Sequence, residues 1–440
     1  MSSLDGPVEQ RIAALSRIHP KGFDLSLERI TRLLSTLGDP HQNLPPTIHV
    51  AGTNGKGSTI AFARSILEAS GLLVHAHTSP HLVRWNERYR LAGKLVDDET
   101  LCDAIDRVAD VNDGQPITVF EILTAVAFLL FSEHEADACL VEVGLGGRFD
   151  CTNVMAEVAV SVIAPVSMDH EMHLGDTIAK IAFEKAGIIR PKVPVVVGPQ
   201  HYDALGVIER QAAKLHAPVV AAGQHYHARV EQGRLVFQDE TALLDLSLPR
   251  LPGQHQIDNA GLAIAACRML AERQNLSITE TACDAGLTNA QWPARLQLIS
   301  QGRLVELLPP DTELWVDGGH NEAAADMVAR HICALNDRNS LPLVLVCGML
   351  TTKNPATYLA HFAGLARKVY TVPIPSSDAG YVPEALATFV KQAGIEALAV
   401  ADLASALRKA SDEFDEMRVL IAGSLYIAGQ ALQDNETFPS

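Results

Sequence analysis

The chain has 440 residues, of which 48% are hydrophobic and 20% charged, so it is long enough for two domains and too apolar for a disordered protein. Its formal net charge of −17 argues against nucleic-acid and anionic-membrane partners, but small anions need only a local group of donors. The seven cysteines form no C-x-x-C pair, and we find neither a signal-peptide pattern nor a long apolar run. These features predict a cytoplasmic protein.

A glycine-rich stretch at residues 51–59, AGTNGKGST, follows a short apolar strand and precedes a helix predicted from Ser58 to Ser70. Such a loop turns backbone N–H groups toward phosphates, and Lys56 can reach the outer ones. The strict P-loop pattern is not met, because Val50 takes its first glycine position and Gly57 separates Lys56 from Ser58. A glycine turn without a ligand is the alternative. Before it, residues 7–38 predict two helices that cover an edge of the sheet.

Polar side chains follow the next predicted strands. Ser79 comes after the strand at 72–77 and begins a loop predicted over 78–91, Glu142 lies near the end of the strand at 138–143, and His170 follows the strand at 158–164. Ligands of open α/β sheets bind at the carboxyl ends of the strands, so Ser79 can reach the same crevice as Lys56. Glu142 and His170 predict a Mg²⁺ site beside the phosphates. Zinc is an alternative, although three convergent nitrogen or sulfur ligands are not evident.

Two charged residues on predicted helices allow more than one interpretation. Glu121, in the apolar helix at 117–131, is most simply a partner of the helix dipole. Lys185, in the helix at 177–191, either extends to solvent or is buried with a lowered pKa that frees its amine for chemistry, carbamylation included.

The alternation of strands and helices restarts after a short segment, and this predicts two domains. A strand at 193–199, a hairpin at 226–237 and an Ala-rich helix with Asn259 near its start complete the first. We expect an α/β protein: a P-loop, doubly wound parallel-sheet domain at 1–290, a hinge at 291–298, and a smaller Rossmann-like α/β domain at 299–440. Its predicted strands lie within 313–321, 341–349, 368–374, 397–401 and 418–424.

Nine stretches resemble, in order, the folylpolyglutamate synthase/dihydrofolate synthase family of the Mur-ligase-like group of ATP-dependent amide ligases. They are HVAGTNGKGST, TSPHL, VEVGLGGRFDCTN, SMDH, EKAGI, GQHQIDNA, PARLQ, VDGGHN and GSLYIAG. The resemblance implies addition of L-glutamate to dihydropteroate, to the γ-carboxyl of folate, or to both, through an acyl phosphate. It implies ATP and two Mg²⁺ ions, leaves open a monovalent cation such as K⁺, and implies a monomer.

The resemblance also assigns roles to residues. It implies ATP contacts by Asn54, Gly55, Lys56, Gly57, Ser58, Asn259, Arg295, Asp317 and His320. It implies metal ligation by Ser79, Glu142 and His170, a carbamate on Lys185, and catalytic roles for Lys56, Glu142, His170 and Lys185. The region matching the family's pterin site comprises Gly22, Phe23, Asp24, Leu25, Thr118, Val119, Phe120, Glu121, Phe149, Asp150 and Cys151. Cys151 and Phe183 are larger than the residues that we expect at these two positions of the family. The difference affects the expected fine specificity for the pterin and not the expected fold.

Two other functions compete with this interpretation. A peptidoglycan Mur ligase has the same chemistry, but it places a nucleotide-sugar-binding domain of about a hundred residues before the loop. Only 51 residues precede Gly52, too few for such a domain and the first strand. A P-loop regulatory ATPase would hydrolyse ATP without glutamate and would not need DGGHN in a second domain.

Overall fold

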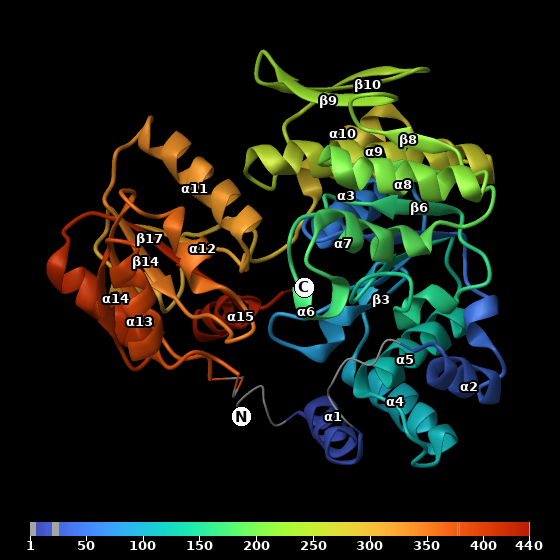
Figure 1. Ribbon diagram of the computed structural model, residues 1–440, viewed down its shortest axis with the longest axis horizontal. Coiled ribbons are helices and arrows are strands. Elements are labelled where there is room, and N and C mark those ends of the chain that lie inside the picture. The colour runs from blue at the N-terminus through green and yellow to red at the C-terminus, as the bar shows by residue number, and fades with distance from the viewer. Residues whose placement is uncertain (1–5, 20–25, 376, 378, 440) are drawn as a thin grey trace. The chain divides into compact units, whose positions relative to one another are not determined.

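The computed structural model describes residues 6–19, 26–375, 377 and 379–439 (Figure 1). Contacts between residues divide the chain into two compact units. The larger comprises Met1–Arg250 and Gln256–Gln291, and the smaller comprises Leu251–His255 and Trp292–Ser440. No helix in the described part of the chain is both long enough and apolar enough to span a membrane.

The larger unit is built on an eight-stranded sheet with the order β4-β3-β2-β5-β1-β6-β7-β8. Six neighbouring strands are parallel, and β3 and β4 are antiparallel at one edge. This order confirms the doubly wound fold, with β1 near the point where the winding reverses. The strands are β1 Thr47–Ala51, β2 Val74–His77, β3 Tyr89–Leu91, β4 Lys94–Leu95, β5 Ala138–Glu142, β6 Val160–Ile163, β7 Val195–Val197 and β8 Val219–Ala221.

Four helices share one core on one side of this sheet: α1 Pro7–Ile18, α2 Glu28–Thr36, α4 Asp98–Asn112 and α5 Val119–Glu133 (Figure 1). The two predicted N-terminal helices are confirmed, but the prediction that they cover a sheet edge is wrong. Their apolar faces pack on α4 and α5. The edge itself is occupied by β3, which lies in a segment predicted as loop, and by β4.

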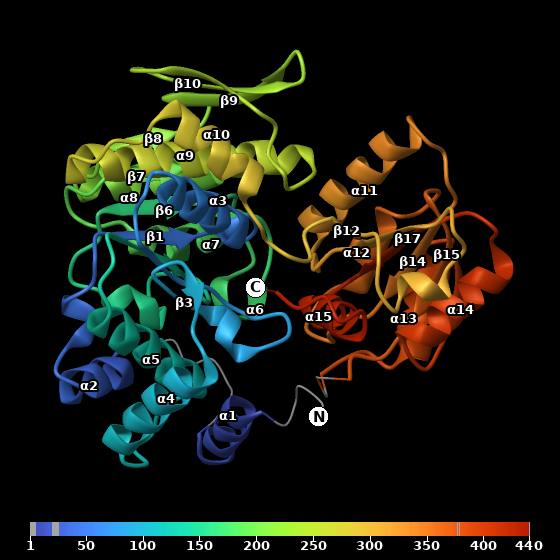
Figure 2. The ribbon, with the colours of Figure 1, turned by 180° about the vertical axis from the view of Figure 1, so that it is seen from behind.

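The remaining helices of the larger unit are α3 Lys56–Ala69, α6 Glu171–Leu174, α7 Ile178–Lys185, α8 Tyr202–Lys214, α9 Gln254–Gln274 and α10 Glu280–Asn289. α3 packs against α10, and α7 against α8 (Figure 2). The predicted hairpin is confirmed as β9 Tyr226–Glu231 and β10 Arg234–Asp239, and β11 Leu243–Leu246 extends it. The sequence analysis did not identify α8, β8, β11 or α10.

The smaller unit has a six-stranded sheet with the order β12-β13-β17-β14-β15-β16. Its strands are β12 Gln297–Ile299, β13 Glu313–Val316, β14 Leu343–Cys347, β15 Ala366–Thr371, β16 Glu396–Ala399 and β17 Arg418–Ala422. Its helices are α11 Glu322–Asn336, α12 Pro355–Ala360, α13 Pro383–Gln392, α14 Leu403–Glu413 and α15 Leu425–Asp434. The five predicted strands are confirmed. The end of the predicted hinge differs, because it forms β12, antiparallel to β13.

Candidate active site

The glycine-rich loop connects β1 to α3, and the helix begins at Lys56 rather than at the predicted Ser58. Gly52 and Gly55 have φ of +154° and +86°. A Cβ atom at Gly52 would lie 2.7 Å from Cβ of Ala164, and one at Gly55 would overlap the Asn259 side chain. Glycine is therefore required at both positions. At the end of the loop, the first turn of α3 presents backbone N–H groups that lack partners within the helix, which favours a phosphate.

Lys56 folds over this loop toward a buried carboxylate. Its Nζ lies 3.2 Å from the Gly52 oxygen and 3.3 Å from the Thr53 oxygen. It also lies 3.7 Å from Oε1 of Glu142 at the carboxyl end of β5. The ammonium group is thus between the phosphate-binding loop and the candidate metal ligand.

Glu142 is buried and joins the loop to the next strand. Its Oε2 accepts a hydrogen bond of 3.1 Å from the backbone N–H of Ser79, which follows β2. Because β5 pairs in parallel with both β1 and β2, the sheet itself brings Ser79, Glu142 and Lys56 together. The structure thus places these three predicted residues side by side.

The loop after Ser79 is more ordered than predicted. It contains a short 3-10 helix, Trp85–Arg88, whose preceding N–H groups are bound by the Glu87 carboxylate. Arg88, predicted as a loop residue, is buried, donates to Nδ1 of His81 at 3.0 Å and lies over the Trp85 ring. These contacts fix the backbone beside Glu142.

Asn259 reaches the loop through a residue that sequence analysis missed. Its Nδ2 donates to Oε1 of Gln256 at 3.0 Å, and Nε2 of Gln256 donates to Oγ of Ser58 at 3.3 Å. Gln256 is fully buried in α9. It stands one turn before Asn259 in the GQHQIDNA stretch, so helical spacing could have identified it.

The segment after β6 also packs on the loop. Thr53 Oγ1 donates to the Ser167 oxygen at 3.0 Å and accepts from the Ser167 N–H at 3.1 Å, and Asn54 lies 3.4 Å from Oγ of Ser167. His170 immediately precedes α6, has a backbone in the left-handed region and has a 41% exposed side chain. It lies beside Asp169, whose oxygen accepts its backbone N–H at 2.8 Å.

Lys185 is buried beneath the loop and does not extend to solvent. Its Nζ donates to the Gly52 oxygen at 3.0 Å. Burial, reinforced by the charge of Lys56, lowers the pKa of Lys185 to about 7. The burial of Lys185 excludes its extension to solvent and agrees with the interpretation of a buried lysine with a lowered pKa.

A metal ion would fit the donors at this edge, although the described residues contain no group of three His, Cys, Asp or Glu that could hold one. Mg²⁺ commonly takes one or two carboxylates and completes its shell with phosphate oxygens and water. Glu142 supplies such a carboxylate next to Ser79 and the phosphate loop. The arrangement therefore suits a metal that arrives with a nucleotide.

The predicted acceptor residues begin α5. Thr118 and Glu121 form a capping box, and Arg29 donates to the same Glu121 oxygen at 3.1 and 3.2 Å. The other oxygen of Glu121 is buried and has no hydrogen-bond partner among the described residues. Glu121 is therefore more than a dipole partner. The predicted residues Gly22, Phe23, Asp24 and Leu25 lie outside the described residues.

Asp150 and Cys151 complete this region from the loop after β5. The Asp150 carboxylate accepts from Thr152 Oγ1 at 2.5 Å and from the Leu145 N–H at 2.9 Å, and Thr152 also contacts Nε2 of buried His49 at 2.9 Å. Cys151 Sγ lies 3.1 Å from Thr124, and Phe149 is exposed. Phe120 packs on Gly144, two residues after Glu142, and so joins this region to the sheet edge that carries the candidate metal ligand. His49 and Thr152 were missed because single buried polar residues give no sequence pattern.

Arg295, Asp317 and His320 are close in the smaller unit. Asp317 is buried and accepts from the N–H groups of Leu296 and Gly319 at 2.9 and 2.7 Å. The Arg295 guanidinium packs beside Gly318, whose oxygen lies 3.2 Å from Nδ1 of His320. Burial raises the pKa of Asp317, and the Arg295 charge opposes that rise.

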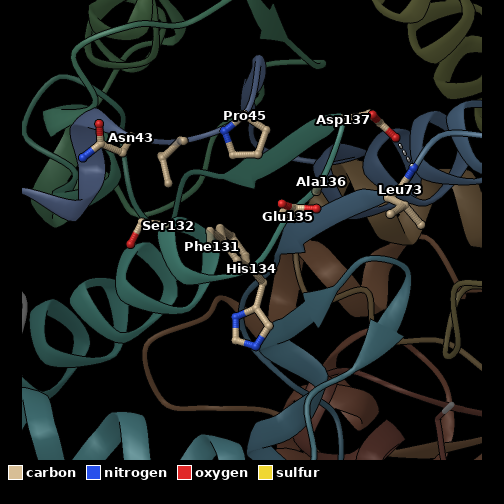
Figure 3. Close-up of a pocket in the computed structure, with 10 residues that line it drawn as sticks. Asn43, Pro45, Leu73, Phe131, Ser132, His134, Glu135, Ala136 and Asp137 are labelled. Atoms are coloured by element: carbon tan, nitrogen blue, oxygen red, sulfur yellow. Dashed lines mark hydrogen bonds between the residues drawn. The ribbon is translucent and has the colours of Figure 1, made fainter.

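A separate hollow of about 450 Å³ lies at the amino-terminal side of β1, β2 and β5 (Figure 3). Figure 3 shows Phe131 and Ser132 at the end of α5, with Asp137 accepting the Leu73 N–H. Because the amino and carboxyl ends of parallel strands lie at opposite edges, this hollow is not part of the candidate active site.

Comparisons with known proteins identify the family of this chain. Residues 50–267 match the Mur ligase middle domain family. Folylpolyglutamate synthase of Lacticaseibacillus casei is 33% identical over 422 residues, covering 92% of this chain and 93% of that protein. E. coli FolC, solved with DHPP and ADP, has a TM-score of 0.86 at 29% identity and covers 98% of both chains.

A further solved structure, a bifunctional folylpolyglutamate synthase/dihydrofolate synthase with Mn, AMPPNP and L-glutamate bound, has a TM-score of 0.84 at 28% identity and covers 98% of both chains. The predicted resemblance is confirmed over nearly the whole chain. The chain belongs to the folylpolyglutamate synthase/dihydrofolate synthase family and is an ATP-dependent carbon–nitrogen ligase.

Proposed function

We propose that this enzyme uses ATP to join L-glutamate to the free carboxylate of dihydropteroate, of a reduced folate, or of both. The observation that carries the proposal is the meeting of Lys56, Glu142 and Ser79 at one sheet edge, next to the acceptor region that Phe120 and Gly144 join to it. A nucleotide phosphate and an acceptor carboxylate can share that edge.

The reaction has two steps. An acceptor carboxylate oxygen attacks the γ-phosphorus of ATP, and the bond from that phosphorus to the β–γ bridging oxygen breaks. ADP departs, and the acceptor becomes an acyl phosphate. The glutamate amine then attacks the acyl carbon and loses a proton, and inorganic phosphate leaves as the amide forms. The Lys56 ammonium and the N–H groups at the start of α3 meet the developing phosphoryl charge, so positioning and electrostatics supply most of the catalysis.

The cofactors are ATP and a divalent metal, taken to be two Mg²⁺ ions. Glu142 and Ser79 would hold one ion and His170 the other. Bound metal neutralises phosphate charge and aligns the transferred group. The buried Lys185 amine, neutral above its pKa of about 7, can add to carbon dioxide and place a carbamate beside Asp169 and Lys56.

The remaining predictions extend this proposal. Arg295, Asp317 and His320 are proposed nucleotide contacts, and the smaller unit is proposed to complete the site and exclude water from the acyl phosphate. The seven cysteines form no disulfide, and six are buried, which supports a reducing, cytoplasmic location. We take the enzyme to be a monomer without nucleic-acid or membrane partners.

The test is phosphate release from Mg-ATP with L-glutamate, with dihydropteroate or tetrahydrofolate added in separate reactions. Release with both acceptors indicates a bifunctional enzyme, and release with tetrahydrofolate alone indicates tail lengthening. Lys56→Ala is the matched inactive control, expected to lose at least about 100-fold in turnover. A rate of phosphate release that depends on neither glutamate nor the acceptor would instead indicate a regulatory ATPase and overturn the proposal.

A further inference from the structure

A second hollow, of about 610 Å³, lies between α7 and α8 and extends to α6. Its lining includes three cationic residues, Lys180, Arg210 and Lys214, and one acid, Glu184. In a chain with a net charge of −17, a hollow with this excess of positive charge is unexpected on composition alone. The hollow therefore suits an anionic ligand.

Two of these three cationic side chains, those of Arg210 and Lys214, take part in no interaction within the described residues that accounts for their charge. Lys180 pairs with Asp176 at 2.8 Å, one turn earlier in the chain. In contrast, no hydrogen bond or ion pair among the described residues engages the side chain of Arg210 or Lys214. Both are available to a ligand that carries carboxylates.

Arg148, which precedes the proposed acceptor residues Phe149, Asp150 and Cys151, contacts a residue that lines the hollow. The Arg148 guanidinium stacks on the Phe183 ring at 3.9 Å, and Phe183 lines the hollow with 41% of its surface exposed. Nε of Arg148 is buried and has no hydrogen-bond partner among the described residues. An unsatisfied buried donor of this kind is costly unless a ligand satisfies it.

The hollow and the active site share one wall. Lys185 faces the phosphate loop from the inner side of α7, and its neighbour Glu184 lines the hollow. The Glu184 backbone oxygen accepts the N–H of Arg148 at 2.8 Å. Arg148 therefore connects the hollow to Phe149, Asp150 and Cys151, the proposed acceptor residues.

The proposed reaction creates a need for such a hollow. Each cycle adds one glutamate and one further carboxylate between the pterin and the carboxylate that must return to the ATP. As the tail lengthens, both ends cannot keep their places unless the surplus tail lies elsewhere. We propose that the α7–α8 hollow binds the surplus γ-glutamyl tail of long-chain folates, with Arg148, Arg210 and Lys214 contacting its carboxylates.

This inference rests on the proposed function, and its first test compares tail lengths. KM and kcat would be measured with tetrahydrofolate carrying one or five glutamates, using the full-length wild type and Arg210→Ala/Lys214→Ala. Removing two solvent-accessible charges should raise KM for the five-glutamate acceptor about five- to tenfold. KM and kcat for the one-glutamate acceptor should stay unchanged, which also shows that the variant folds.

The control variant Lys94→Ala/Arg273→Ala removes the same two charge types from exposed positions outside the hollow, and it should change neither KM. The proposal is overturned if the wild type uses both acceptors but the hollow variant keeps the wild-type ratio of their KM values. It is also overturned if KM rises equally for both tail lengths.

A second measurement separates this proposal from the proposed reaction. Free penta-γ-L-glutamate, which has no pterin, would be titrated into each protein by calorimetry at two salt concentrations. Binding that weakens with salt, and weakens at least about fivefold in the hollow variant, supports the tail site even if no folate releases phosphate. The tail site is contradicted if the wild type does not bind the peptide, or if the wild type and the hollow variant bind it equally well.

Discussion

Lys56 and Lys185 reach the same backbone oxygen from different helices, and their surroundings give them different chemistry. Both Nζ atoms bond to the oxygen of Gly52, at 3.2 and 3.0 Å. Lys56 has Glu142 within 3.7 Å to balance its charge, whereas Lys185 is buried and close to the charge of Lys56. One lysine is therefore suited to bind phosphate and the other to lose its proton.

Removing the charge of Glu142 tests the metal-binding edge at the scale of a single residue. Glu142→Gln keeps an oxygen that can accept the Ser79 N–H but loses the carboxylate that balances Lys56 and would hold Mg²⁺. We expect kcat to fall at least about 100-fold and the Mg²⁺ concentration for half-maximal activity to rise. A Mg²⁺ titration of activity would measure both.

The matched control is Glu133→Gln, which removes a carboxylate that pairs with Arg107 at the partly exposed end of α5. It should change activity less than about twofold, because exposed pairs contribute little. Equal behaviour of the two variants would refute the proposed role of Glu142.

Lys185 predicts a pH dependence with a defined sign. With a pKa of about 7 in the folded enzyme, the neutral fraction of Lys185 rises steeply from pH 6 to pH 8. Activation by added bicarbonate, and the NMR signal of a carbamate formed from isotopically labelled carbon dioxide, should rise over that range. Lys185→Arg keeps a positive charge that cannot form the carbamate, so it should show neither effect. A carbamate signal that persists in this variant would exclude Lys185 as its site.

The lowered pKa of Lys185 also makes the stability of the protein depend on pH. The pKa of Lys185 is lowered on folding, so between about pH 7 and 10.5 the unfolded chain holds a proton that the folded chain does not. The destabilisation from burying this lysine is complete below about pH 7 and fades as pH rises toward 10.5. In urea unfolding, Lys185→Met should therefore gain stability relative to wild type most at pH 6–7 and least near pH 10. A constant difference across that range would contradict the lowered pKa.

At the scale of elements, the sequence predicted what periodicity and strand ends determine. The glycine loop, Ser79 and Glu142 follow apolar strands, so their meeting at one edge was predictable from parallel pairing. The environments of Lys185 and Glu121 were not, because their burial depends on partners far along the chain, such as Gly52 and Arg29. The packing of α1 and α2 was misassigned for a similar reason, since an amphipathic face does not specify its partner.

The contact between α5 and the strand-end loop after β5 can be tested with a steric change. A Cβ atom at Gly144 would overlap Phe120 and lie 2.7 Å from its Cε1, so Gly144→Ala must displace the Phe120 ring at the start of α5. We expect a loss of about 1–3 kcal/mol in unfolding free energy and a higher KM for the acceptor, with little change in KM for ATP. Urea unfolding and steady-state kinetics would measure these effects.

The compensating variant is Gly144→Ala/Phe120→Leu, which makes room for the added methyl group. It should recover most of the lost stability while the acceptor KM stays raised, because the aromatic ring is absent. If stability is not recovered, the overlap with Phe120 is not the cause of the loss.

At the scale of the whole molecule, the two units have separate sheets and cores, and each carries some of the residues proposed to contact the nucleotide. The larger carries Lys56 and Asn259, and the smaller carries Arg295, Asp317 and His320. Sequence analysis could predict the second α/β unit from the restart of strand–helix alternation. It could not predict that residues 251–255 pack with that unit, because a five-residue segment has no periodicity.

Nucleotide binding should couple to unfolding through both sets of residues. Mg-AMPPNP at about 100 times its Kd should stabilise the wild type by about 2.7 kcal/mol, which corresponds to a Tm increase of about 5–10 °C for a domain of this size. Lys56→Ala should lose most of that increase. If the smaller unit contacts the nucleotide as we propose, Arg295→Ala should also reduce it, whereas the exposed-residue control Arg367→Ala should keep the full value. Differential scanning calorimetry with and without the nucleotide would measure each increase. If the nucleotide raises the Tm of Arg295→Ala as much as it raises that of the wild type, the nucleotide site is confined to the larger unit. A ligand stabilises a protein only through contacts that it makes with the folded state.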